Sequence, residues 1–227
     1  MGAAIGLMCK PPRLGKTRLA AGLGQGAAAR LAAAFLADAA ALAEEVALRA
    51  HAARMAFHAP PDAGAEVAAL LPGWDVRPQA EGDLGARMGA AFGALFAAGA
   101  TKALLIGADA PTLPPALLEL ALSHPAEAVL VPALDGGYCA IALRRASPAL
   151  LDGIPWSTRE VLAATRAAAA RAGISLVELP GWHDVDEAAD LPALRAGLAG
   201  QAPGGCSHLP PWRAQNTLAA WDELSLG

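Results

Sequence analysis

The chain has 227 residues and a formal charge of −4, with acidic and basic residues interspersed along it. This length suits one domain with a full core, and without a basic stripe nucleic acid is not an expected partner. The apolar N-terminal run is short and has no basic segment before it, and the most apolar helical stretch, 27–48, carries charged side chains. We therefore expect no signal peptide, no membrane partner, and a cytoplasmic protein with reduced cysteines.

Short apolar segments alternate with alanine-rich segments of helical pattern, which predicts strands alternating with helices. Glycines at 22, 24 and 26 predict a break in the first helix. Such an alternation gives a mostly parallel sheet with helices on both faces. In chain order we expect strands at 3–9, 54–58, 75–78, 102–107, 128–132, 138–143 and 175–179, and helices at 18–48, 63–71, 84–98, 114–122, 159–172 and 187–198.

Two strands modify this picture. The run 102–107 is apolar after its first residue, as a strand covered on both faces should be, so we place it near the centre of the sheet. The loop between 128–132 and 138–143 is too short for a crossover helix, so the second of these strands pairs antiparallel, with the first or with another neighbour. Residues 1–200 are expected to form one domain, and the Gly- and Pro-rich stretch 201–227 a surface tail.

The loop after the first strand concentrates basic side chains at the start of a helix, among them Lys10, Lys16 and Arg18. Cations there oppose the helix dipole, and a bound phosphate would reverse that penalty through backbone N–H groups near Gly15 and through Lys16 and Arg18. A solvated basic loop is the alternative. Gly15-Lys16-Thr17 also fits part of a nucleoside-triphosphatase P-loop, although Lys10 stands where that motif needs its first glycine.

A second loop opens the helix expected at 84–98. Gly82 and Gly85 flank Asp83, which can cap that helix, and Arg87 lies four residues further on, where it can pair with Asp83. Capping does not require Gly85, whereas a glycine lets a ligand approach the backbone closely. Nucleotide contact and plain capping both remain open.

Carboxylates follow three of the expected strands. Asp109 comes directly after 102–107, as a turn residue or as a ligand for a divalent metal. Asp184 and Asp186 alternate, so an extended segment presents both on one side, and Asp186 can also cap the next helix. Asp135 begins an Asp-Gly hairpin signal that would equally suit the floor of a substrate site. Hard oxygen ligands of this kind suit Mg²⁺ or Mn²⁺.

Six short motifs occur along the chain in the order of a known family: Lys-Thr-Arg-Leu-Ala at 16–20, Gly-Asp-Leu-Gly-Ala-Arg-Met at 82–88, Gly-Ala-Asp-Ala-Pro at 107–111, Asp-Gly-Gly-Tyr at 135–138, Ile-Pro-Trp-Ser-Thr at 154–158 and Asp-Val-Asp at 184–186. On these motifs the sequence resembles a bacterial family of GT-A-fold glycosyltransferase-like proteins, some of them placed in arsenosugar biosynthesis. That family is similar to the guanylyl- and cytidylyltransferases of the same fold. The sequence departs from the family in two places: the first loop is about two residues shorter than the family's form, and Ala110 stands where the family usually has cysteine.

The resemblance implies a GT-A three-layer sandwich, a mostly parallel sheet with an antiparallel strand, and assigns roles to the motifs. Asp109 and Asp186 would hold Mg²⁺ or Mn²⁺, and Asp109, Asp135 and Asp186 would be catalytic. The nucleotide would bind at Lys10, Gly15, Lys16, Arg18, Gly82, Asp83 and Arg87. The acceptor would bind at Gly136, Gly137, Tyr138, Trp156, Ser157 and Thr158.

The first functional hypothesis is metal-dependent transfer of a glycosyl group from a nucleoside-diphosphate sugar to a small-molecule acceptor. The metal would neutralise the diphosphate leaving group, and a carboxylate would act as base on an acceptor hydroxyl. The second is nucleotidyl transfer, in which a phosphorylated acceptor attacks a nucleoside triphosphate and pyrophosphate is released. The third, from another class, is a nucleotide-binding module without catalysis.

Overall fold

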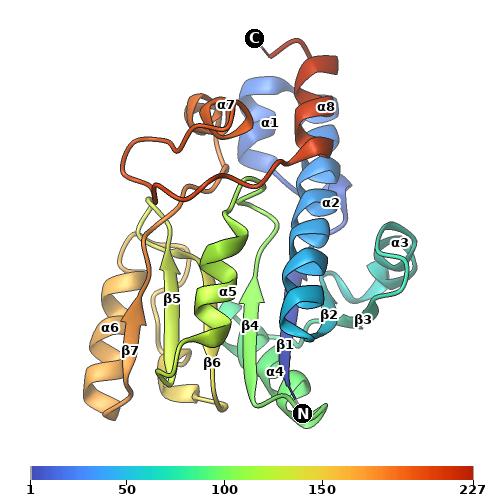
Figure 1. The fold of residues 1–227 in the computed structure, drawn as a ribbon. Coiled ribbons are helices and arrows are strands. Elements are labelled where there is room, and N and C mark those ends of the chain that lie inside the picture. The colour runs from blue at the N-terminus through green and yellow to red at the C-terminus, as the bar shows by residue number, and fades with distance from the viewer. Residues whose placement is uncertain (1, 227) are drawn as a thin grey trace.

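A seven-stranded sheet runs through the computed structural model, which describes residues 2–226 (Figure 1). Its strand order is β3-β2-β1-β4-β6-β5-β7. All pairs are parallel except those of β6, which is antiparallel to both β4 and β5. The strands are β1 (Ala3–Cys9), β2 (Ala53–His58), β3 (Asp75–Pro78), β4 (Lys102–Ile106), β5 (Ala128–Pro132), β6 (Tyr138–Leu143) and β7 (Leu176–Glu178).

The predicted central strand is confirmed. β4 is the fourth of the seven strands, and every one of its residues is buried. Strand β6 lies between β4 and β5, because the short turn after β5 sends the chain straight back beside it, on the side where β4 lies. This one reversed strand distinguishes the sheet from an all-parallel one.

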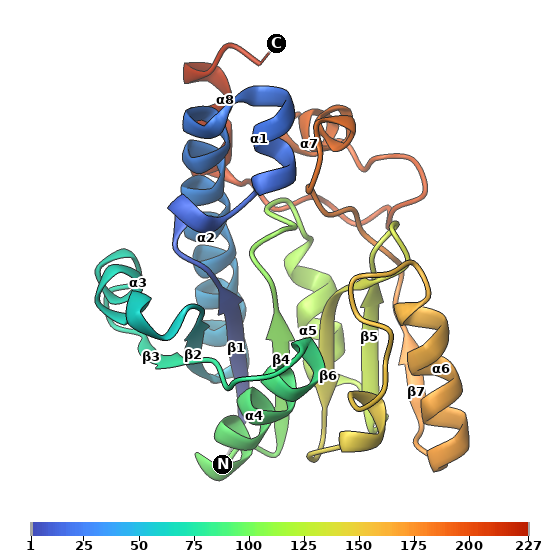
Figure 2. The ribbon, with the colours of Figure 1, turned by 180° about the vertical axis from the view of Figure 1, so that it is seen from behind.

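Helices cover both faces of the sheet, so the predicted three-layer α/β fold is confirmed. Helices α2 and α5 pack on one face and α4 and α6 on the other, as Figures 1 and 2 show from opposite sides. The predicted break in the first helix falls at Gly24, whose φ of +84° suits glycine. The helices are α1 (Thr17–Leu23), α2 (Gln25–Ala50), α3 (Gly64–Leu70), α4 (Leu84–Ala97), α5 (Pro115–Ser123), α6 (Val161–Ala172), α7 (Leu191–Leu198) and α8 (Gln215–Glu223).

The C-terminal stretch contains a helix that the sequence analysis did not expect. Helix α8 packs against α2, and its Ala220 and Trp221 join a buried cluster with Phe35 and Val185. In Figure 1 this helix lies with α1 and α7 at the end of the sheet to which the arrowheads of β4 and β5 point. Among the helices of residues 2–226, none has the length and the apolar run that a bilayer crossing requires.

Candidate functional site

The loop after β4 and the segment 184–186 meet beyond the carboxyl end of the central strand. The backbone N–H of Val185 donates a 2.9 Å hydrogen bond to the carbonyl of Asp109. That bond holds Asp109 beside Asp186, although the two are separated by most of the second half of the chain. In a parallel α/β sheet the loops that follow the strands gather at this edge, so residues far apart in the sequence can meet there.

Lys16 stands between the two carboxylates for which the sequence predicts a metal. Its Nζ forms ion pairs with Asp109 and with Asp186, the latter at 3.0 Å, and it donates to the carbonyl of Val185 at 2.6 Å. The ammonium also lies 5.5 Å from the centre of the Phe35 ring, a cation–π distance. The Lys16 side chain is only 6% exposed, so the cation is an integral part of this site.

The electrostatics keep this ammonium charged. Burial lowers the pKa of Lys16, but the negative charges of Asp109 and Asp186 and their hydrogen bonds outweigh burial, so the pKa is raised. Lys16 itself has a φ of +53°, in the left-handed region, directly before helix α1. The backbone therefore departs from its ordinary range where it aims this side chain at the carboxylates.

Arg18 continues the same arrangement on the solvent side. It pairs with Asp186 and, at 3.3 Å, with Glu187, and its side chain remains 65% exposed. The two cations predicted to bind phosphate thus contact the carboxylates predicted to bind metal.

The other two residues predicted in the first loop lie outside this ion-pair network. Gly15 is extended and lies against α2, where an added Cβ would be 3.0 Å from the Cβ of Ala32. Lys10 is exposed.

The carboxylates form a wider cluster around Asp184. The pKa of Asp184 is raised to about 7, first by burial and then by the charges of Asp135 and Asp186. Asp109 contributes to the same effect, so all four carboxylates share one region. Unlike Asp186, Asp184 has no cation within ion-pair distance among residues 2–226. Cys139, at the start of β6, borders the cluster, and its pKa is raised mainly by burial.

The residues fit a divalent metal only in part. Asp109 and Asp186 supply hard oxygen atoms that already converge on one cation, as Mg²⁺ or Mn²⁺ requires. Within residues 2–226, however, no group of three or more His, Cys, Asp or Glu side chains is arranged to hold a metal. Two carboxylates alone would leave the remaining positions to water and phosphate oxygens, which is how Mg²⁺ is often bound beside phosphates.

In the second loop, one structural role was expected from the sequence and one was not. Asp83 caps α4 by accepting a 2.9 Å hydrogen bond from the N–H of Ala86, as the capping alternative expected. The role of Gly85 was not expected. A Cβ on Gly85 would stand 2.2 Å from the carbonyl oxygen of Leu151 and 2.6 Å from Nε1 of Trp156. The close approach that requires glycine is thus made by the protein's own chain. Arg87 donates to the carbonyl of Gly82 at 2.9 Å rather than to Asp83.

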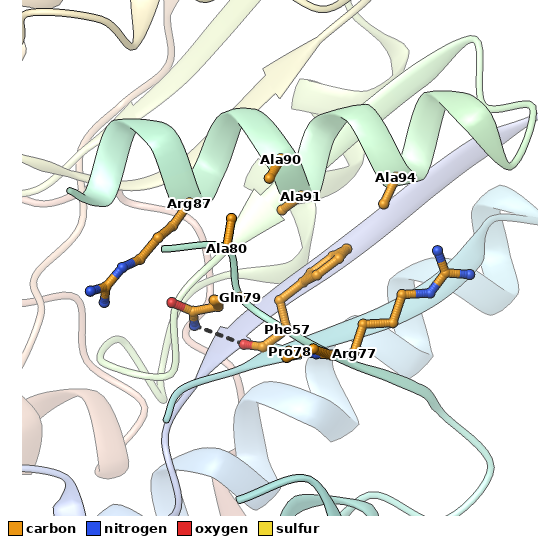
Figure 3. A pocket seen from close by; sticks show the side chains of 9 residues that line it. All are labelled: Phe57, Arg77, Pro78, Gln79, Ala80, Arg87, Ala90, Ala91 and Ala94. Carbon is orange, nitrogen blue, oxygen red and sulfur yellow. Dashed lines mark hydrogen bonds between the residues drawn. The ribbon is translucent and has the colours of Figure 1, made fainter. Parts of the chain in front are cut away.

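A groove of about 260 Å³ begins beside this loop, between α4 and the edge strand β3 (Figure 3). Gln79 follows β3 and donates from Nε2 to the carbonyls of Phe57, at 2.9 Å, and Cys9, at 3.3 Å. Its amide oxygen is left on the side of Arg87 (Figure 3). Sequence reasoning missed Gln79, whose only signal was its place directly after a strand at the ligand-binding edge.

The hairpin turn at Asp135 is fixed in place by α6. Asp135 accepts a 2.8 Å hydrogen bond from the N–H of Gly137. Gly136 has a φ of +97°, and a Cβ there would lie 2.3 Å from the carbonyl oxygen of Arg159. The carbonyl of Gly136 in turn accepts from the N–H of Leu162 at 2.8 Å. The two glycines therefore serve the turn and its close contact with α6.

Beside this turn lies the aromatic pair of the predicted acceptor region. The rings of Tyr138 and Trp156 meet edge to face, with centroids 6.2 Å apart and planes at 82°. Tyr138 Oη and Trp156 Nε1 are buried and have no hydrogen-bond partner among residues 2–226. Ser157 has a φ of +63°, and Thr158 donates to the carbonyl of Pro155 at 2.7 Å. The structure thus gathers the residues predicted for the acceptor around one turn.

His183 has a structural environment. Its Nε2 lies 3.0 Å from Oγ1 of Thr112, which also accepts a 3.2 Å bond from Nε1 of Trp182. The side chain is buried, and burial lowers its pKa. This network connects the residues directly before the segment 184–186 to Thr112, in the loop after β4.

The strand order and the helices on both faces define a three-layer α/β protein with a cluster of carboxylates and cations beyond the carboxyl end of β4. Residues 37–158 match DUF2064, described as an uncharacterized protein conserved in bacteria, and the chain belongs to this family. No curated protein matches it.

Several solved structures are similar to this chain. The chain is 30% identical to a candidate nucleotide-diphospho-sugar transferase from Desulfovibrio desulfuricans G20, over 99% of this chain and 97% of that one, with a TM-score of 0.83. A CMP:2-keto-3-deoxy-manno-octonic acid synthetase complexed with CTP is 15% identical over 88% and 99%, with a TM-score of 0.53. A 4-diphosphocytidyl-2C-methyl-D-erythritol synthase is 14% identical over 86% and 98%, with a TM-score of 0.52. The latter two show the fold alone, and together these relatives leave no support for the P-loop alternative.

Proposed function

We propose that the protein is a metal-dependent glycosyltransferase whose donor is a nucleoside-diphosphate sugar. The observation that carries the proposal is the convergence of two cations, Lys16 and Arg18, with two carboxylates, Asp109 and Asp186, beyond the carboxyl end of β4. A diphosphate and a divalent metal carry the charges complementary to these two pairs. Similarity to the Desulfovibrio desulfuricans protein supports this donor class.

In this proposal Lys16 and Arg18 bind the diphosphate, and Asp109 and Asp186 bind Mg²⁺ or Mn²⁺. When bound, the metal supplies charge neutralisation for the diphosphate as it leaves. Lys10, Gly15 and the turn Gly82–Asp83 flank the donor. The base of the nucleotide lies toward the groove between Gln79 and Arg87, where an amide oxygen and a guanidinium face open space.

The acceptor lies on the other side of the carboxylate cluster. The turn of Asp135, Gly136 and Gly137 forms its floor, with Tyr138 and Trp156 beside it and Ser157 and Thr158 at its rim. Asp135 is the candidate base for an acceptor hydroxyl, because it borders the cluster and lies within the turn.

Nucleotidyl transfer is the second candidate, because the fold is shared with a synthetase complexed with CTP. The two reactions are separated by their products. We would incubate the protein with Mn²⁺, nucleoside-diphosphate sugars or nucleoside triphosphates, and a panel of small-molecule acceptors. Release of a nucleoside diphosphate identifies glycosyl transfer, and release of pyrophosphate identifies nucleotidyl transfer. Tight Mn²⁺-dependent binding without either product would identify a nucleotide-binding module instead.

Asp109→Asn and Asp186→Asn test the site itself. Each removes one charge from the pair and keeps the shape of the side chain, so Mn²⁺-dependent nucleotide binding should be lost in both. Asp62→Asn is the control, because Asp62 is exposed and lies outside the cluster. Full Mn²⁺ dependence in both variants would refute the two-carboxylate site.

A further inference from the structure

In the structure, the protein's own cation, Lys16, fills the position between the two carboxylates. Lys16 Nζ contacts Asp109, Asp186 and the carbonyl of Val185, and the ring of Phe35 covers it. Arg18, by contrast, reaches Asp186 from outside and is mostly exposed. A phosphate can therefore reach Arg18 from solvent, whereas Lys16 must first leave its carboxylates.

We propose that Lys16 and the divalent metal are alternative occupants of the space between Asp109 and Asp186, so that metal enters the site only as Lys16 moves to the donor's phosphates. This inference rests on the proposed function and adds to it an exchange of cations. In the ligand-free protein, Lys16 acts as an internal substitute for the metal. In the loaded protein, the same side chain binds the diphosphate.

Charge balance is the physical reason for the exchange. A divalent ion added while Lys16 stays in place would bring two cations within a few ångströms of each other, which repel strongly in a partly buried site. Lys16 leaving alone would expose two neighbouring carboxylates without a counter-ion, which is also costly. Metal and phosphate arriving together avoid both costs, since the metal neutralises the carboxylates and the phosphate neutralises Lys16.

The side chain is built for such a move. The ammonium ends a flexible four-carbon stem, so its head group can change partners by rotation about side-chain bonds alone. The carboxylates are held more firmly, since the backbone of Asp109 is tied to Val185 and two N–H groups, those of Asp186 and Glu187, donate to Asp190 at 2.8 Å. The exchange thus moves one side chain against a fixed frame.

If the two cations exchange, the metal binds weakly as long as no phosphate is present to bind Lys16. Without the Lys16 ammonium, the metal no longer needs phosphate in order to bind tightly. We would titrate Mn²⁺ into the nucleotide-free protein and follow free Mn²⁺ by electron paramagnetic resonance. Lys16→Met removes the charge and keeps an apolar stem over Phe35. Arg13→Met is the matched control, since it removes one cation from the same loop. Arg13 forms a 2.9 Å ion pair with Glu66 and does not contact the cluster of carboxylates.

Lys16→Met should bind Mn²⁺ roughly tenfold or more tightly than the wild type, within the usual range for coupled sites, whereas Arg13→Met should match the wild type. The melting temperature provides a second readout: Mn²⁺ should raise it more in Lys16→Met than in the wild type, which also reports that the variant is folded. Adding Asp109→Asn to Lys16→Met should abolish the gain.

Equal Mn²⁺ affinity in Lys16→Met and the wild type, whether tight or too weak to detect, would overturn the exchange. A gain of the same size in Arg13→Met would overturn it as well, because the effect would then be one of general charge. The titration uses Mn²⁺ alone and requires no turnover. A failed transferase assay together with tighter Mn²⁺ binding in Lys16→Met would therefore refute the proposed reaction and leave the cation exchange standing.

Discussion

Asp38 connects the C-terminal helix α8 to α2, and its removal tests what holds α8 in place. Asp38 lies on α2 and is 1% exposed. One of its oxygens accepts from the N–H and Nδ2 of Asn216 at 3.1 and 2.8 Å, and the other from the N–H and Oγ1 of Thr217 at 2.7 and 2.6 Å. A single buried carboxylate thus satisfies the first donors of α8, where the helix dipole also favours negative charge.

Asp38→Ala should cost about 3–5 kcal/mol of unfolding free energy, because it leaves several buried donors of α8 without a partner at about 1–3 kcal/mol each. Thr217 is itself fully buried, so its two donors would lose their partner without gaining water. For a chain of this length, each kcal/mol lowers the melting temperature by about 2–4 °C, so we expect a fall of roughly 6–20 °C. Asp62→Ala, an exposed carboxylate, should change stability by no more than about 0.5 kcal/mol.

The assay combines calorimetric melting with limited trypsin digestion. Arg213 is exposed and precedes α8, so a loosened helix would be released by cleavage after this residue. Mass spectrometry would detect the loss of the C-terminal segment in Asp38→Ala well before the wild type is cut. A variant that melts within about 1 °C of the wild type and resists trypsin equally would show that apolar packing of Trp221, and not Asp38, holds the helix.

Three further predictions concern the site and its frame. Lys16→Ala should weaken nucleotide binding by about 1.5–3 kcal/mol, the range for a hydrogen bond to a charged group, and calorimetry with Mn²⁺ present would measure it. Burial, then the neighbouring carboxylates, raise the pKa of Asp184 to about 7 in the folded protein. Because the folded state holds this proton more tightly than the unfolded chain, the stability that Asp184 contributes is present near pH 4 and is lost as the pH rises through 7. In metal-free buffer at pH 8, Asp184→Asn should recover about 1–3 kcal/mol after solvent screening, and an unchanged pH profile of denaturation would contradict this. Gly85→Ala should cost about 1–3 kcal/mol because the new Cβ meets Leu151, whereas Gly89→Ala, whose Cβ would lie 3.8 Å from the Leu151 side chain, should not destabilise α4.

Much of the architecture follows from local patterns in the sequence. The run 102–107 contains the central strand because consecutive apolar residues in a short segment suit burial on both faces. The loops that the sequence singled out lie at the ligand-binding edge, because each follows a strand of the same direction or opens the next helix. The family resemblance implied a metal pair of Asp109 and Asp186, and the structure brings both carboxylates to the same lysine.

Other features depend on partners that lie far away in the chain. The contacts of Lys16 with Asp109 and Asp186 join residues 93 and 170 positions apart, and no local period or spacing encodes such a contact. For this reason the sequence predicted a phosphate-binding lysine and a metal-binding pair as separate features, whereas the fold joins them in one ion-pair network. Gly85 is similar, since its need for glycine comes from the backbone of Leu151.

Periodicity and the order of elements were enough to predict the alternation of strands and helices, the central strand and the edge where charged side chains gather. Three features could be seen only in the folded protein: β6 lies between β4 and β5, α8 packs against α2, and Lys16 fills the space between two carboxylates. Strand neighbours and helix docking depend on which distant surfaces fit together, and the position of a charge depends on which opposite charges the fold brings within reach. These are properties of the packed chain, which local sequence patterns do not specify.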